Sequence, residues 1–223
     1  MKTKTILAAA LVMLSLLLIN QRASAQTETP RYEVGAQFTS LTKPGFGQSR
    51  TDPGFGGRFT YNITDYLAVE AETNFFPEKS TFNVPAENEG RAVEGLFGVK
   101  AGKRFSKFGI YGKARPGFIS FSQGKQEAFP LANSSNQFPI FDVRRSRLTN
   151  FATDVGGVLE FYPSRHIVTR FEAGDTIIRY RNRTINDITG FDPATGQYSF
   201  GPVTIQGDTR SNFQFSAGVG YRF

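Results

Sequence analysis

Apolar and polar residues alternate with a period of two along most of this chain, and this alternation constrains the fold more than any other feature. The last segment shows it most clearly, with aromatic or small apolar residues at every second position: Phe213, Phe215, Ala217, Val219, Tyr221 and Phe223. A period of two is typical of a β-strand with two unlike faces. Each segment has about the 9–11 residues that a tilted strand needs to cross a bilayer.

Eight such segments follow one another from Arg31 onward, and we predict a strand for each. They cover residues 31–41, 54–62, 66–76, 92–104, 108–121, 150–162, 166–180 and 212–223. Three-residue connections alternate with long ones, which are residues 42–53, 77–91, 122–149 and 181–209. All long connections therefore lie at one end of the sheet. Short periplasmic turns and long extracellular loops are typical of an outer-membrane barrel. The predicted fold is all-β, an eight-stranded antiparallel up-and-down transmembrane β-barrel.

The polar positions of the predicted strands contain equal numbers of acids and bases. The acids are Glu33, Glu70, Glu72, Glu94, Asp154, Glu160 and Glu172, and the bases are Arg58, Lys100, Arg104, Lys113, Arg115, Arg170 and Arg222. In a membrane barrel the apolar face contacts lipid, so these charges would point into the lumen. Eight strands leave room only for the barrel's own side chains. Because an unpaired buried charge is strongly destabilising, we expect a closed salt-bridge network.

The aromatic residues fall into two bands, one at each end of the predicted strands. The turn-end band contains Tyr32, Tyr61, Tyr66, Phe105, Phe108, Phe161, Tyr162, Tyr221 and Phe223; the loop-end band contains Phe38, Phe55, Phe75, Phe118, Phe151 and Phe213. Two aromatic girdles are what membrane interfaces favour. Pro116 is the main exception to the strand pattern, because proline cannot donate to a ladder. We expect a bulge at Pro116–Gly117 to accommodate it.

The N-terminal segment has the composition of a cleaved secretory signal peptide over residues 1–25. Lys2 and Lys4 precede an apolar run from Ile6 to Ile19, and a small-residue site ends at Ala25. The alternative is an uncleaved N-terminal anchor. Residues 26–223 would then form the barrel domain. The segment contains three bases and no acid, so the net charge falls from +7 to +4 after cleavage, and we do not expect nucleic acid as a partner.

The leader, the alternating strands, the short and long connections and the terminal "GVGYRF" together resemble the OmpA/OmpX-like family of small outer-membrane β-barrels. The resemblance implies an exported, porin-like membrane protein in the outer membrane of a Gram-negative cell, surrounded by outer-membrane lipid and lipopolysaccharide. It also implies that Tyr221 and Phe223 belong to a signal read by the barrel assembly machinery. The chain lacks the peptidoglycan-binding domain of longer family members, so anchoring to the cell wall is not implied.

Catalytic and cofactor motifs are sparse. The single histidine, His166, falls in a predicted periplasmic turn, where we interpret it as structural, because general-base chemistry needs a placed nucleophile or water. The chain has no cysteine and no cluster of metal-ligand spacing. We therefore predict no enzyme activity, no cofactor and no metal site.

Six arginines flank the two longest predicted loops: Arg144, Arg145, Arg147, Arg179, Arg181 and Arg183. Arginine suits bidentate phosphate binding, and lipopolysaccharide presents phosphates at this level of the membrane. The hypothesis is a lipopolysaccharide-binding rim. The alternative is an ordinary solvated loop end.

The sequence favours a structural or adhesive protein with a closed lumen. Its long loops, with aromatic residues such as Phe138, Phe141, Phe191 and Tyr198, would recognise an extracellular ligand whose identity the sequence does not reveal. A narrow pore for small solutes, an outer-membrane enzyme and a soluble periplasmic β-barrel carrier are the alternatives.

Overall fold

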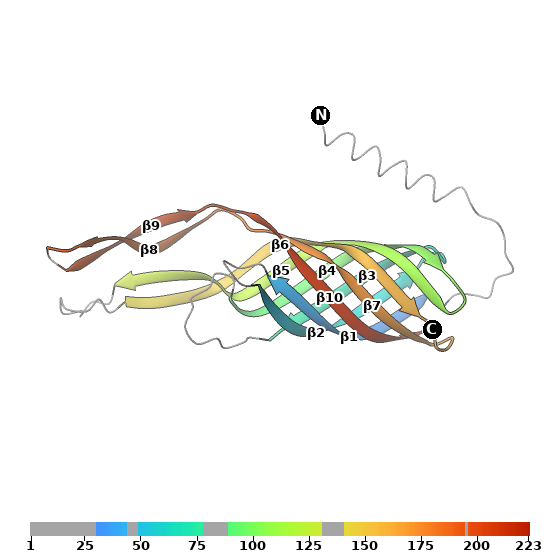
Figure 1. Ribbon diagram of the computed structural model, residues 1–223. Helices are drawn as coiled ribbons and strands as arrows, with labels where there is room; N and C mark the ends of the chain where they lie inside the picture. The colour runs from blue at the N-terminus through green and yellow to red at the C-terminus, as the bar shows by residue number, and fades with distance from the viewer. Residues whose placement is uncertain (1–29, 44–48, 78–88, 131–140, 195) are drawn as a thin grey trace, which may run out of the picture.

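Eight strands pair edge to edge into a closed antiparallel barrel in the computed structural model of the protein (Figure 1). The structure describes residues 30–43, 49–77, 89–130, 141–194 and 196–223. The barrel strands are β1 (Tyr32–Lys43), β2 (Arg50–Asn62), β3 (Leu67–Phe76), β4 (Glu89–Arg104), β5 (Phe108–Pro130), β6 (Phe141–Phe161), β7 (Ile167–Arg179) and β10 (Thr209–Arg222). Each strand pairs with its neighbours in the order β1-β10-β7-β6-β5-β4-β3-β2, and β1 closes the barrel on β2. The predicted fold class is confirmed.

The two faces of the barrel are inverted relative to a soluble protein. Large apolar side chains point outward and are exposed, with 61% of Phe97 and 59% of Val219 accessible. The alternate positions point inward, and all but one of the fourteen predicted lumen charges are buried there, the exception being the half-buried Arg104. Asp175 is the one acid on the outer face of β7. In a bilayer, this arrangement places the apolar face against lipid.

The N-terminal strand and the C-terminal strand form the seam of the barrel. β1 pairs with β10 from Glu33–Arg222 to Thr42–Phe213. Just outside this ladder, Tyr32 and Phe223 donate backbone N–H groups to each other's carbonyls at 3.0 and 2.9 Å. Their rings also stack, with centroids 5.8 Å apart. No strand edge is left open at the seam, which a bilayer requires.

Two strands are much longer than the sequence pattern predicts, and two were missed. β5 and β6 continue beyond the barrel as a hairpin, to Pro130 and from Phe141, through residues predicted to be loop. The predicted loop 181–209 contains a second hairpin, β8 (Arg183–Asp192) and β9 (Gln197–Ile205). Outside the membrane neither face of a strand must be apolar, so the period-two signal is weak there.

The bulge predicted at Pro116–Gly117 is wrong. β5 keeps a constant register with β6 through Pro116, which lies opposite Thr153. Toward β4, pairing is interrupted between Leu96–Gly117 and Val99–Ala114 but resumes in the same register. The ladder therefore loses contacts locally where proline has no N–H to donate, and no residue is inserted. The register shifts of β5 with its two neighbours lie closer to the extracellular end, where β5 leaves the barrel.

The predicted signal peptide and Phe138 lie outside the described residues. Among the residues that are described, no helix is long and apolar enough to cross a membrane.

We expect deletion of Phe223 to reduce barrel assembly in the outer membrane. The deletion removes both backbone hydrogen bonds to Tyr32, each worth about 1 kcal/mol net, together with the stacked ring. The assembled fraction can be measured by gel migration of unheated outer membranes. Phe105→Ala is the matched control, since it removes another exposed aromatic from the turn end and leaves the seam intact. Equal assembly of both variants and wild type would contradict the prediction.

Candidate functional site

Arg115 lies at the centre of the lumen and contacts four carboxylates. Its guanidinium is 2.5 Å from Glu72, 2.5 Å from Asp154, 2.7 Å from Glu172 and 3.4 Å from Glu70. None of its side-chain surface is accessible. Because β5 places Arg115 inward and its four partners come from β3, β6 and β7, this one side chain ties together strands from different parts of the barrel.

Arg170 forms a second centre on β7, which is separated from β5 by β6. It pairs with Glu70, and it lies 2.5 Å from Glu172 and 3.3 Å from Glu160. Lys100 joins the same carboxylates from β4, at 2.5 Å from Glu160 and 3.6 Å from Glu70. Glu70, Glu160 and Glu172 are therefore each shared by at least two bases, which compensates the cost of taking these charges out of water.

Lys113 and Arg58 extend the network to its edges. Lys113 lies 2.8 Å from Asp154 and 2.6 Å from Glu172. Arg58 lies 2.7 Å from Glu33 and 3.5 Å from Glu172. Eleven of the fourteen predicted lumen charges thus form one connected set, with six acids and five bases.

Glu94 is buried and has no ion pair among the described residues; Asn74, which also donates to Glu72 at 2.8 Å, links it to the network. Instead of a base, two amides hold one of its oxygens: the NH₂ groups of Asn74 and Gln214 donate to Oε2 at 2.7 and 3.1 Å. Its Oε1 has no hydrogen-bond partner among the described residues. The amide of Gln37 continues this layer by donating to Asn74 at 2.9 Å. The amide side chains, which the sequence analysis left largely unassigned, therefore form a second polar layer in the lumen.

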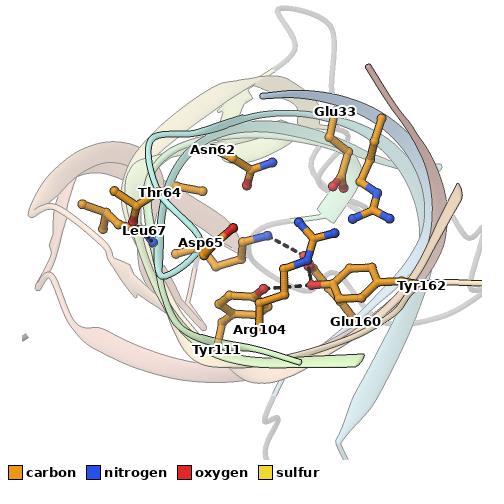
Figure 2. Close-up of a pocket in the computed structure, with 12 residues that line it drawn as sticks. Glu33, Asn62, Thr64, Asp65, Leu67, Arg104, Tyr111, Glu160 and Tyr162 are labelled. Carbon is orange, nitrogen blue, oxygen red and sulfur yellow. Dashed lines mark hydrogen bonds and ion pairs between the residues drawn. The ribbon is translucent and has the colours of Figure 1, made fainter. Parts of the chain in front are cut away.

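The last two predicted lumen charges, Arg104 and Arg222, lie at the periplasmic mouth. Each guanidinium lies 4.4 Å from the ring centroid of Tyr162, a favourable cation–π distance. The Tyr162 hydroxyl donates to Glu160 at 2.8 Å and lies 2.8 Å from the hydroxyl of Tyr111 (Figure 2). Tyr162 thus connects the two arginines at the mouth to the salt-bridge network.

A small cavity is enclosed by these mouth residues. Its lining includes Glu33, Asn62, Asp65, Arg104 and Tyr162 (Figure 2). Its volume is about 10 Å³, which is room for about one water molecule.

An apolar layer fills the lumen at the opposite, outer end. Its members point inward and are buried: Leu41, Phe76, Ala92, Ile119, Phe121, Ala152, Ile178 and Tyr180. The apolar–polar alternation does not predict this layer, because these residues occupy the inward, nominally polar positions of their strands. Residue spacing does indicate their direction: Phe121 and Ile119 are separated from Arg115 by even numbers of residues along β5, so all three lie on the inward face of the strand.

The predicted arginine rim is distributed over two hairpins. Arg144 lies 3.1 Å from Asp142 and 4.8 Å from the ring centroid of Phe129. Arg145 donates to the side-chain carbonyl of Gln123 at 3.0 Å. Both arginines are therefore engaged by the β5–β6 hairpin itself.

The other members of the predicted rim lie at different heights. Arg179, at the end of β7, pairs with Phe151 on β6. Arg147 lies on β6 four residues before Phe151, so the backbones of these two residues are about 14 Å apart at the usual rise per strand residue. Arg181 is exposed after β7, and Arg183 begins β8. The six residues thus do not share one patch.

His166 lies in the β6–β7 turn. Its ring stacks on Tyr221 with centroids 5.7 Å apart, and the Ser164 hydroxyl accepts the backbone N–H groups of His166 and Ile167 at 3.3 and 3.1 Å. These contacts stabilise the turn. Among the described residues, no group of three or more His, Cys, Asp or Glu side chains could hold a metal ion.

The closed eight-stranded barrel, with its apolar outer face and its salt-bridged interior, defines an outer-membrane barrel protein. The family model for the outer membrane protein beta-barrel domain matches residues 9–223, so the chain belongs to this family. A search of curated proteins finds no match.

Several solved structures are similar to the chain. Ail, the attachment invasion locus protein of Yersinia pestis, is 15% identical and covers 88% of this chain and 100% of its own, with a TM-score of 0.46. Neisserial surface protein A is 14% identical, covers 86% and 97%, and has a TM-score of 0.46. The N-terminal barrel domain of Pseudomonas aeruginosa OprF is 12% identical, covers 85% and 97%, and has a TM-score of 0.40.

We expect Arg115→Met to destabilise the barrel by about 3–5 kcal/mol, the usual cost of breaking a buried ion pair on one side. The substitution leaves four buried carboxylates without their shared cation. Urea unfolding of the barrel in lipid vesicles, followed by gel migration, measures the loss. Arg144→Met is the control, because Arg144 is exposed and its one ion pair is exposed too; we expect a change within about 0.5 kcal/mol. A loss from Arg115→Met no larger than the control's would contradict the central role of Arg115.

Proposed function

We propose that the protein is a non-conducting outer-membrane barrel that presents two hairpins outside the membrane for recognition of an extracellular partner. The barrel would serve as the rigid membrane anchor, and the hairpins would supply the binding surface. The observation that most supports this proposal is the pair of hairpins: they project from the end of the barrel opposite the C-terminus (Figure 1).

The two hairpins contact each other, which favours a shaped surface over two independent loops. The side-chain amide of Asn186 on β8 donates to the backbone carbonyl of Ala128 on β5 at 2.6 Å. Ile185 and Ala128 are both buried, with 8% of each accessible. Exposed loops on a rigid scaffold commonly contain binding residues.

The tip of the β8–β9 hairpin has an aromatic pair, in which Phe191 is exposed and Tyr198 is half-buried. The ring centroids of Phe191 and Tyr198 lie 4.7 Å apart, and 53% of the Phe191 surface is accessible. Exposed aromatic residues are enriched at binding hot spots, and here they lie outside the membrane, where no lipid accounts for their exposure. Phe141 begins β6 at the other hairpin.

The layered lumen supports the non-conducting part of the proposal. An ion crossing it would have to pass the mouth residues, the salt-bridge network, the amide layer and the apolar layer in turn. The pore alternative needs a continuous water path through all four. The soluble-carrier alternative is disfavoured by the exposed apolar band and by family membership.

We expect no reproducible unit conductance from the purified wild-type barrel in a planar bilayer. The matched variant replaces Glu70, Glu72, Arg115 and Arg170 together with glycine, which removes two acids and two bases and leaves the net charge unchanged. The variant empties the centre of the lumen but keeps the amide layer and the apolar layer. Conductance in the variant alone would assign the barrier to the salt-bridge network, and its absence would show that the other layers are sufficient to block the lumen. Regular conductance steps from the wild type would overturn the proposal; gel migration shows whether the variant is folded.

We expect Phe191→Ala combined with Tyr198→Ala to reduce binding to the extracellular partner. The probe is adhesion of barrel-displaying bacteria to a panel of immobilised matrix proteins and polysaccharides. Thr184→Ala combined with Thr204→Ala is the control, since these exposed residues pair in the stem of the same hairpin. Adhesion of the wild type to some surface, lost in the tip variant and kept in the stem variant, supports the proposal. No adhesion by the wild type, or equal adhesion of all three, contradicts it.

A further inference from the structure

A groove of about 340 Å³ lies on the outer surface of the barrel near its extracellular end. Its lining residues come from four adjacent strands, β3 to β6: Phe75, Arg91, Val93, Phe118, Ser120, Ser122, Arg147 and Thr149. They occupy the outward positions of these strands, so the groove opens toward the surrounding membrane and not into the lumen.

The lower part of the groove is apolar. Phe75 and Phe118 belong to the loop-end aromatic band, and Val93 pairs with both Phe75 on β3 and Ser120 on β5. Gly95 lies directly beneath Phe118: a Cβ at this position would be 2.8 Å from the aromatic ring. The ring therefore packs flat against the backbone of β4, and a larger residue there would displace it. This part suits a hydrocarbon chain.

The upper part of the groove is polar and basic. Arg91 and Arg147 are both exposed, and none of the described residues that line the groove is acidic. The hydroxyls of Ser120 and Thr149 lie 2.8 Å apart on its floor. Two cations and several hydroxyls above an apolar wall match an anionic headgroup joined to an acyl chain.

Backbone irregularities on both sides shape this upper part. The β4–β5 register shifts between Glu89 and Ala92, and the β5–β6 register shifts between Phe121 and Lys125. Bulges re-aim side chains and are common next to binding sites. Gly90 has a φ of 87°, a conformation that favours glycine, and a Cβ there would lie 2.3 Å from the Ser122 hydroxyl. The two arginines thus emerge where the regular ladder is interrupted.

Arg91 and Arg147 can reach a common anion. They lie on β4 and β6, on either side of β5, so their backbones are separated by two strand spacings, or about 10 Å. Both side chains are long enough to converge above Ser122, and each guanidinium can bind a phosphate through two parallel hydrogen bonds.

We propose that this groove binds a phosphorylated glycolipid of the outer leaflet, of the lipopolysaccharide class. Arg91 and Arg147 hold a phosphate, the hydroxyls of Ser120, Ser122 and Thr149 contact the sugar, and an acyl chain lies against Phe118. Only Arg147 belongs to the rim predicted from the sequence. The site goes beyond the proposed recognition function, because it lies on the lipid-facing wall and involves neither hairpin tip.

The test is native mass spectrometry of the full-length mature barrel in detergent, with bisphosphorylated lipid A as the probe. Arg91→Gln combined with Arg147→Gln should weaken lipid A binding by about tenfold or more, which corresponds to about 1.4 kcal/mol. Arg179→Gln combined with Arg181→Gln is the matched control: it removes the same charge at the same end, away from the groove. Unchanged binding of lipid A by the groove variant would overturn the site. Equal losses of binding in both variants would also overturn it, because they would indicate a general electrostatic attraction of lipid A to the basic residues at this end of the barrel.

A second variant tests the groove without changing its charge. Ser120→Trp should fill the groove and displace lipid A although both arginines remain, and an indole is well tolerated at a membrane interface. Dephosphorylated lipid A should bind the wild type more weakly than the bisphosphorylated form, and inorganic phosphate alone should not compete at equal concentration. Undiminished binding to Ser120→Trp, no preference for the phosphorylated lipid, or displacement by free phosphate would each contradict the proposal. Gel migration confirms that every variant is folded.

Discussion

Buried acids and bases pair across the lumen, and this pairing fills the barrel and ties its strands together. Eight strands curve too tightly to enclose a water-filled channel, so the side chains that point inward must fill the lumen themselves. In this protein charged side chains fill the centre of the lumen, and a charge removed from water is tolerated only when opposite charges and hydrogen bonds surround it. Arg115 contacts four carboxylates and Arg170 contacts three. Because these contacts cross from strand to strand, the interior that fills the barrel also connects its strands.

The bilayer imposes the complementary constraint on the backbone and the outer face. A spanning strand has no water to satisfy an open edge, so the chain must close on itself, and β1 does so with β10 and β2. Beyond the membrane this constraint ends, and the same strands β5 and β6 continue as a hairpin whose residues no longer alternate cleanly. The groove at Arg91 and Arg147 lies at the boundary between the membrane-spanning and the extracellular parts of the strands. The ladder is regular and aromatic residues line the groove below this boundary, whereas the register shifts and the side chains are basic above it.

Most of the barrel could be predicted from the sequence, because a period-two pattern is a local signal. It identified all eight barrel strands. It also identified the inward direction of the fourteen predicted lumen charges, because contact with lipid favours apolar residues at the outward positions. It also led to errors. Pro116 was expected to need a bulge, yet the ladder tolerates the missing donor by losing pairs locally. β8 and β9 were missed because a strand in water need not alternate. The apolar layer around Phe121 was missed because apolar residues were assigned to the outside.

The alternation of residues therefore identifies the class of the protein: the number of barrel strands, the inside and outside of each of them, the end at which the long connections lie, and an interior of nearly balanced charge. These depend on residue spacing alone. The three-dimensional arrangement sets which charges meet, since Arg115 and its partners are separated by 39 to 57 residues along the chain. The same arrangement gives Glu94 amide partners, and no ion pair among the described residues, and it brings Arg91 on β4 and Arg147 on β6 into one groove. Such neighbours are set by register and closure, which are properties of the whole barrel and of no single segment.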